Sequence, residues 1–177
     1  AHGIDPHVIG VGLDFLAHTS TLGTGAYWDA HTQVTRLPTG QYGNPATDIA
    51  SVFVPSTVPM DEALLADLNA SAYLDFVGPA ILKARPNIVA VYFINALGAT
   101  TYYPNIGLAS VVPPDFDPRT QTFYTIAIPE NNPERKPMWT PPYQDPAGNG
   151  LMVTNALPVY DPAEQLRGVL AADVQLI

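Results

Sequence analysis

The sequence contains no cysteine and few charged residues, and both absences restrict what this chain can do. Without cysteine among its 177 residues, it has no disulfide, no thiolate nucleophile and no cysteine-based zinc site. Only 13% of the residues are charged, where about 25% is usual. Seven are Lys or Arg and 16 are Asp or Glu, and the resulting net charge of −9 disfavours binding to nucleic-acid phosphates.

Long apolar runs and standard catalytic motifs are also missing. No stretch approaches 18 consecutive apolar residues, so no membrane span is predicted. The sequence has no G-x-S-x-G nucleophile elbow, no P-loop, no G-x-G-x-x-G and no H-E-x-x-H. The four histidines, His2, His7, His18 and His31, all precede residue 32, and we interpret them as surface or tag-adjacent residues. We therefore predict neither a metal ion nor a cofactor.

Hydrophobic residues make up 47% of the chain, enough for the core of one domain. The strongest helical pattern covers residues 61–84, with acidic residues at its start, Arg85-Pro86 at its end and a kink expected at Gly78-Pro79. A weaker helical pattern covers residues 6–17. The apolar face of the long helix is predicted to contain Leu64, Leu65, Leu68, Ala72, Phe76 and Val77.

Strand patterns dominate from residue 87 onward. Residues 88–94 and 100–103 predict an antiparallel hairpin, and residues 138–143, 150–160 and 165–176 predict three more strands after a crossover. This order predicts an α+β fold: an antiparallel sheet of about five strands flanked by helices, with the long helix beside it and the helices segregated to one side. We expect a single domain, in which residues 1–86 form a helical and loop region that packs on a sheet core of residues 87–177.

The last predicted strand places a carboxylate at a covered position. Along the strand predicted over 169–176, apolar side chains occupy both faces, which indicates that both faces are covered. Asp173 lies on one of these two faces. A buried carboxylate needs a partner, so Asp173 is either an anchor for a ligand or a structural cap for a loop amide. Aromatic residues gather in the same half of the chain, which is typical of a ligand pocket and equally of core packing. They are Tyr92, Tyr102, Tyr103, Phe123, Tyr124, Trp139 and Tyr143.

Two acidic groups resemble loose oxygen-ligand sets. Residues 115–117 and 145–149 contain Asp and Asn, but they lack the spacing and the terminal Glu of a calcium loop. Turn chemistry beside Pro and Gly explains them, so no calcium site is predicted.

Five ordered segments carry a resemblance to a known family. They are residues 87–93 with Leu97-Gly98, the run D-P-R-T-Q-T-F-Y-T-I-A at 117–127, W-T-P-P-Y-Q-D at 139–145, residues 154–161 with P-V-Y-D, and R-G-V-L-A-A-D-V at 167–174. In this order they resemble the Cache domain, a PAS-like extracytoplasmic sensor module of bacterial histidine kinases and chemoreceptors. The resemblance is to the double-Cache type with a partly truncated lead-in helix, and either a single module or an excised membrane-distal module fits it.

The resemblance implies binding rather than catalysis. It implies an extracytoplasmic, periplasmic or extracellular, sensing domain of a membrane-bound signalling protein, with a sensor histidine kinase as the favoured parent and a homodimer in the full-length receptor. Loops 104–122 and 129–137 are expected to close over the sheet when a ligand binds. The predicted ligand-binding residues are Tyr103, Gln121, Phe123, Tyr124, Trp139, Tyr143, Asp145 and Asp173.

One departure from the family bears on the ligand. Amino-acid-binding members resemble this sequence but carry an Arg that clamps the ligand carboxylate where Gln121 stands here, and a Trp where Phe123 stands. A neutral amide cannot form the charge-assisted bidentate bond. We therefore expect an amine, a polyol or another small polar metabolite instead of a standard amino acid.

Two other functions stay open at this point. The first is a structural or dimerisation module without a ligand, whose pocket would be filled by its own side chains. The second is a hydrolase that uses Asp115, Asp117, Asp145 or Asp173 as acid or base, with carboxylate pairs at glycosidase-like separations.

Overall fold

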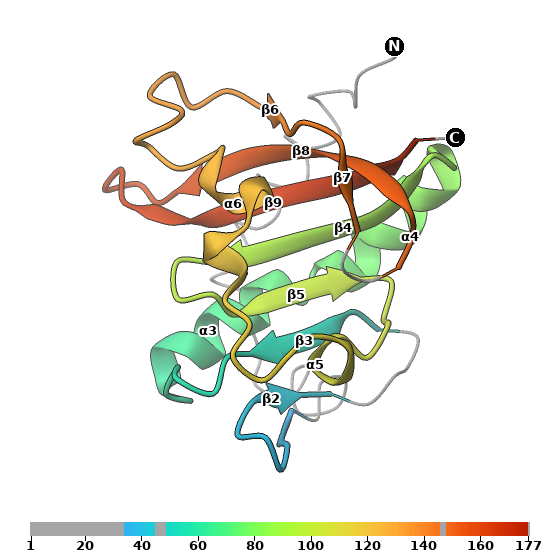
Figure 1. Ribbon diagram of the computed structural model, residues 1–177. Helices are drawn as coiled ribbons and strands as arrows, with labels where there is room; N and C mark the ends of the chain where they lie inside the picture. The colour runs from blue at the N-terminus through green and yellow to red at the C-terminus, as the bar shows by residue number, and fades with distance from the viewer. Residues whose placement is uncertain (1–33, 45–48, 146–147, 177) are drawn as a thin grey trace.

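The computed structural model describes residues 34–44, 49–145 and 148–176, and a sheet with only antiparallel pairings lies at its centre (Figure 1). The histidines and the weak helical pattern over 6–17 lie outside these residues. Nine strands of the described part join the sheet. In spatial order they are β1 (Thr35–Arg36), β2 (Tyr42–Gly43), β3 (Ser51–Val54), β5 (Thr100–Tyr103), β4 (Ile88–Asn95), β9 (Leu166–Gln175), β8 (Leu151–Tyr160) and β6 (Met138–Trp139), with β7 (Tyr143–Gln144) also pairing with β8.

The predicted α+β class and PAS-like sheet are confirmed. Five longer strands, β3, β5, β4, β9 and β8, form the centre, and four two-residue strands extend its edges. The strand predicted over 138–143 is wrong in one respect, because it is split into β6 and β7. Pro141 and Pro142 lie in the gap and have no N–H for a ladder bond. β1, β2 and β3 precede residue 87, so the sheet extends on both sides of the boundary expected there.

The helical stretch predicted over 61–84 consists of two helices, α3 (Glu62–Ser71) and α4 (Leu74–Ala84), that cover one face of the sheet (Figure 1). The chain breaks at Ala72 and Tyr73, not at Gly78-Pro79, and Pro79 lies inside α4. Leu64 and Leu68 pack on β3 as expected. Because the helix restarts at Leu74, the buried face moves to new positions. Leu65 and Phe76, predicted to face the core, are therefore 37% and 57% exposed.

Helix α3 begins with a side-chain cap. The carboxylate of Asp61 accepts a hydrogen bond from the Leu64 amide at 2.9 Å and satisfies one of the amides that have no partner within the helix. Replacing Asp61 by Ala should therefore lower the free energy of unfolding by about 1 kcal/mol, which for a chain of this size is about 2–4 °C in melting temperature. Asp61→Asn is the control, because Asn caps equally well. Equal losses in both variants, measured by thermal unfolding, would rule out the cap as the cause.

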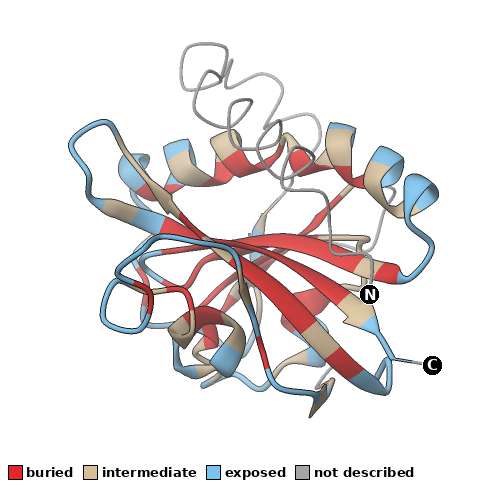
Figure 2. Cartoon of the chain, turned by 90° about the horizontal axis from the view of Figure 1, so that it is seen from above, coloured by how far each residue is buried: buried red, intermediate tan, exposed pale blue. Residues whose placement is uncertain are grey.

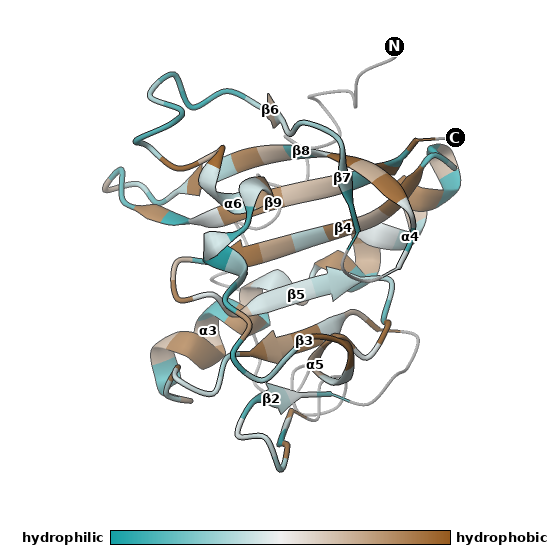
Figure 3. Ribbon diagram, in the orientation of Figure 1, coloured by the Kyte–Doolittle hydropathy of each residue, from teal (hydrophilic) through white to brown (hydrophobic). Residues whose placement is uncertain are grey.

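A crossover from β5 to β6 covers the opposite face of the sheet, which differs from the expected segregation of helices to one side. It contains α5 (Leu108–Val111), the 3₁₀ helix η2 (Pro118–Thr120) and α6 (Thr122–Thr125). The reason lies in the central strands β4 and β9, whose apolar residues are buried on both faces and need two covering layers (Figures 2 and 3). Buried strand residues lie between the α3–α4 layer and the crossover (Figure 2).

The two faces of the central strands separate as alternation predicts. On β9, Val169 and Ala171 belong to the cluster under the crossover, whereas Leu170 and Ala172 pack with α4. A β-bulge between Ile88 and Ala90 interrupts this alternation on β4 and keeps Ala90 under the crossover, directly opposite Asp173. Within the described residues, no helix is long and apolar enough to cross a membrane.

Candidate functional site

A cavity of about 60 Å³ lies between the crossover and the sheet. Since roughly 10–15 Å³ is enough to hold one water molecule, the cavity is large enough for a small molecule to enter in place of solvent. Its walls come from three parts of the chain: the strands β4, β5 and β9, the crossover, and the segment around β7. The lining residues are Tyr92, Ile94, Thr100, Tyr102, Leu108, Val112, Phe116, Pro118, Phe123, Tyr143, Asp145 and Asp173.

Asp173 is the buried acid of this cavity, with only 3% of the residue exposed. Its Oδ1 accepts hydrogen bonds from Thr154 Oγ1 at 2.7 Å, from Tyr92 Oη at 2.8 Å and from Tyr143 Oη at 3.3 Å. The hydroxyls of Tyr143 and Thr154 are also 2.6 Å apart. The donors come from β4, β7 and β8, so the strands on both sides of β9 hold this carboxylate in place.

Strand register explains why these groups meet. Asp173 stands opposite Ala90 of β4 and Thr154 of β8, so Thr154 is its direct cross-strand neighbour. Tyr92 lies two positions along β4 from Ala90 and on the same face, and its ring reaches the carboxylate. The carboxylate and its hydroxyl donors are therefore all held by strands.

All three hydrogen bonds reach the same carboxylate oxygen. Among the described residues, no donor binds Asp173 Oδ2. A carboxylate has about four lone-pair sites in total, so acceptor capacity remains on the side chain. Since Asp173 lines the cavity, this second oxygen is the natural acceptor for a bound molecule with N–H or O–H donors.

Burial perturbs the acid–base properties of the site. It raises the pKa of Asp173 from 3.8 to about 6, and the negative charge of Asp145 acts in the same direction, while the bonds from Thr154, Tyr92 and Tyr143 oppose it. Burial and the charge of Asp173 raise the phenol pKa values of Tyr92, Tyr102 and Tyr143 well above their ordinary value. The phenols therefore keep their protons and act as hydrogen-bond donors at neutral pH.

The raised pKa of Asp173 predicts a pH-dependent stability. Because its folded-state pKa of about 6 exceeds the ordinary value of 3.8, the folded chain holds this proton more tightly than the unfolded chain. The stabilisation is fully present below about pH 4 and is lost as the pH rises through about 6. Relative to Asp173→Asn, wild type should lose about 2–3 kcal/mol of unfolding free energy between those limits. Urea unfolding of both proteins at several pH values measures this, and a difference independent of pH would contradict it.

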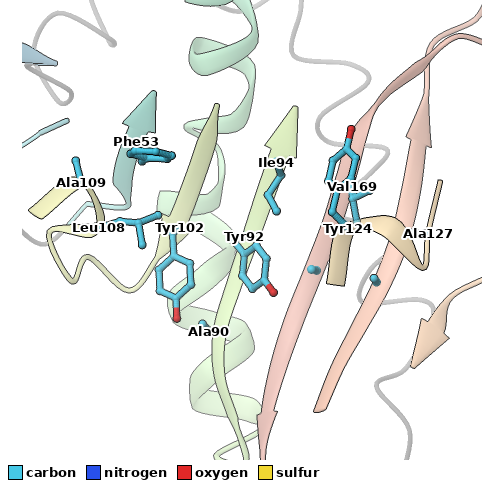
Figure 4. Packing of buried hydrophobic residues seen from close by; sticks show 12 residues of the cluster. Phe53, Ala90, Tyr92, Ile94, Tyr102, Leu108, Ala109, Tyr124, Ala127 and Val169 are labelled. Atoms are coloured by element: carbon cyan, nitrogen blue, oxygen red, sulfur yellow. The ribbon is translucent and has the colours of Figure 1, made fainter. Parts of the chain in front are cut away.

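Four aromatic rings form a connected wall beside the carboxylate. Tyr102 and Tyr92 are stacked with centroids 5.3 Å apart, and Tyr92 meets Phe123 edge-on at 5.8 Å. Phe123 in turn lies 6.3 Å from Tyr143. Figure 4 shows Tyr92 and Tyr102 projecting side by side from β4 and β5. The wall joins residues of the sheet to the crossover, so a molecule in the cavity touches both.

The structure brings together four of the predicted ligand-binding residues. Phe123, Tyr143, Asp145 and Asp173 all line the cavity. Asp145 lies directly after β7, where its Oδ2 accepts hydrogen bonds from the backbone and side-chain nitrogens of Asn149. These contacts fix the position of the Asp145 carboxylate, which is partly exposed.

The other four predicted residues lie outside the cavity. Tyr103 packs on the α4 side of the sheet, over Gly78, where a Cβ would lie 2.5 Å from the Tyr103 ring. Tyr124 is buried in the core beneath the crossover. Gln121 donates a hydrogen bond to Thr120 Oγ1 at 3.1 Å, and Trp139 is 43% exposed on β6. Their positions do not support direct contact with a ligand in this cavity.

Several lining residues were absent from the predicted set, and strand alternation is the signal that would have found some of them. Tyr92 and Ile94 share the cavity face of β4, and Thr100 and Tyr102 share that of β5, two residues apart in each case. The same rule separates Tyr102 from its neighbour Tyr103. Thr154, which donates to Asp173 but does not line the cavity, opens the segment 154–161 that carries the family resemblance, and its contact with Asp173 depends on the pairing of β8 with β9. Among the described residues, no group of three or more His, Cys, Asp and Glu side chains is placed to hold a metal ion.

Comparison with known families gives one match. The model of the methyl-accepting chemotaxis protein-like, first PDC sensor domain matches residues 70–177, well over half of the chain. The match includes α4, the strands β4 to β9 and the whole crossover. No curated protein sequence matches the chain.

Solved structures give partial matches. The ligand-binding domain of the Pseudomonas aeruginosa amino acid chemoreceptor PctC, in complex with GABA, is 33% identical over 51% of this chain and 38% of that one, with a TM-score of 0.41. That of the Pseudomonas fluorescens chemoreceptor CtaA, in complex with L-alanine, is 28% identical over 54% and 40%, with a TM-score of 0.43. The sensory domain of the Campylobacter jejuni chemoreceptor Tlp3 is 18% identical over 67% and 46%, with a TM-score of 0.47. The chain spans less than half the length of each of these domains.

Proposed function

The chain belongs to the methyl-accepting chemotaxis protein-like first PDC sensor domains, and from this premise we propose that it binds a small polar molecule in the cavity around Asp173. The observation that carries the proposal is the carboxylate itself. Asp173 is buried, held by three hydroxyl donors on Oδ1, and has Oδ2 left for a ligand. Burying a charge is costly unless it is paired, and a ligand that donates to Oδ2 supplies the missing partner.

The parent protein in this proposal is a membrane-bound chemoreceptor, with this domain on the extracytoplasmic side. The matching family model describes chemotaxis proteins, which favours a chemoreceptor over the sensor histidine kinase preferred from the sequence. The double-Cache arrangement and a homodimer of the full-length receptor are parts of the same proposal.

Signalling in this proposal is a shift between two conformations. The cavity walls belong to the sheet on one side and to the crossover on the other, through residues such as Leu108 and Phe123. A ligand that bonds to Asp173 and touches the crossover favours the state in which the two are closed together. The opposite face of β9 packs on α4. A displacement of β9 at Asp173 therefore changes the packing of this helix.

The two alternative functions have less support. A purely structural module would fill the pocket with its own side chains, whereas this site retains a cavity of about 60 Å³. For a hydrolase, Asp115 is exposed and Asp117 is paired with Arg119 at 2.8 Å, which leaves Asp145 and Asp173 in the cavity. The family is one of sensor domains, which supports binding and not turnover.

A thermal-shift screen of the refolded protein tests the proposal. Unfolding and refolding first removes any ligand carried through purification. A ligand at 100 times its dissociation constant adds about 2.7 kcal/mol, or roughly 5–10 °C in melting temperature for a domain of this size. A saturable shift from one chemical class, lost in Asp173→Asn, is the expected result. A screen of amines, amino acids, polyols, organic acids and purines without any shift would reject the proposal.

A further inference from the structure

The charge of the cavity narrows the class of molecule that it accepts. Two of its lining side chains are carboxylates, those of Asp145 and Asp173, and none of the described lining residues is Lys or Arg. A wall with two carboxylates and no cation produces a negative potential in a site of low dielectric constant. Such a site attracts cations and repels ligand carboxylates.

No lysine or arginine elsewhere in the chain is placed to neutralise the two carboxylates of the cavity. The sequence has seven such residues, and all seven lie in the described part and are exposed. Arg119, the one nearest to the site in sequence, binds Asp117 with Nε at 2.9 Å and Nη2 at 2.8 Å, and Arg167 pairs with Asp67. The full set is Arg36, Lys83, Arg85, Arg119, Arg135, Lys136 and Arg167.

The aromatic wall suits a cation as well. A cationic group within about 6 Å of the face of a Tyr or Phe ring is attracted by the ring quadrupole, more strongly when water is excluded. The connected rings of Tyr102, Tyr92, Phe123 and Tyr143 stand next to Asp173. A single ammonium group in the cavity therefore gains both a carboxylate oxygen and aromatic surface.

From this placement we propose that the cavity selects small organic amines that lack a carboxylate, and discriminates against amino acids and organic acids. This inference rests on the proposed sensing function and names its ligand class. An amino acid would satisfy Asp173 with its ammonium group but would bring its carboxylate next to two like charges, with no guanidinium or lysine ammonium to offset them. Juxtaposed like charges cost several kilocalories per mole, which corresponds to on the order of 100-fold in affinity.

Matched pairs of ligands test the selectivity by isothermal titration calorimetry on the refolded wild-type protein. Ethanolamine is compared with L-serine, isobutylamine with L-valine, and propylamine with 4-aminobutyrate, since the members of each pair differ only by a carboxylate. Propionate serves as an acid without an amine. We expect at least one amine to bind at least about tenfold more tightly than its carboxylated counterpart, and propionate not to bind.

The outcomes separate this inference from the function on which it rests. Amino acids that bind as tightly as the amines, with dependence on Asp173, would overturn the selectivity and leave the sensing function intact. If none of the compounds binds, both the amine selectivity and the sensing function are overturned. Asp145→Asn should reduce the ratio between amine and amino acid affinities several-fold, whereas Asp115→Asn, the same change at an exposed residue outside the cavity, should leave it unchanged. Equal effects of the two variants would contradict a local role for Asp145.

Discussion

Asp173→Asn is expected to weaken ligand binding on the order of 100- to 1000-fold. Truncating or neutralising one partner of a buried, hydrogen-bonded charge pair costs about 2–5 kcal/mol. The substitution preserves shape, and the Asn side-chain oxygen still accepts from Tyr92 and Thr154, which donate at 2.8 and 2.7 Å in wild type. The folded state is therefore retained, and the loss falls on the charge offered to the ligand.

Calorimetric titration of wild type, Asp173→Asn and Asp115→Asn measures this effect. Asp115 is exposed and does not line the cavity, so its variant controls for the change in net charge. Thermal unfolding confirms that each variant is folded. An affinity within threefold of wild type for a folded Asp173→Asn protein would show that Asp173 is a structural residue and not the ligand anchor.

Gly168→Ala is expected to be the most destabilising glycine-to-alanine substitution in the sheet. Gly168 of β9 stands opposite Asn95 of β4. A Cβ at this position would fall far inside contact distance of the Ile94 carbonyl oxygen, and would lie 2.8 Å from Asn95 Cα. Backbone atoms of a central strand cannot move aside without breaking the β4–β9 pairing, so we expect a loss of roughly 3–5 kcal/mol.

Gly107→Ala provides a matched control for this loss. Gly107 has a left-handed backbone, with φ 63° and ψ 45°, and no atom lies within 4 Å of a Cβ built there. The cost is therefore the conformational strain alone, about 1–2 kcal/mol. Thermal unfolding should show a drop of about 10 °C or more for Gly168→Ala and only a few degrees for Gly107→Ala. Similar drops in the two variants would mean that β4 and β9 can move apart to accommodate the new methyl group with little loss of unfolding free energy.

Local patterns predicted the elements of this fold well, because each pattern depends on neighbours in the chain. The strand over 100–103 agrees with β5, and the alternation around Asp173 separates the two faces of β9. The errors have local causes that the patterns overlooked. The break at Ala72 and Tyr73 shifted the buried helix face, and two prolines divided β6 from β7. Of the eight predicted ligand-binding residues, Phe123, Tyr143, Asp145 and Asp173 line the cavity and the other four do not.

By itself, the sequence determined the α+β class, the position of a buried carboxylate in the last strand and the acidic balance of the chain, since these follow from residue type and periodicity. Only the tertiary structure decided which groups meet. The order of β4, β9 and β8 brings Asp173 to Tyr92, 81 residues away, and to Thr154, 19 residues away. Contacts between distant segments depend on strand order and crossover packing, which no short pattern contains.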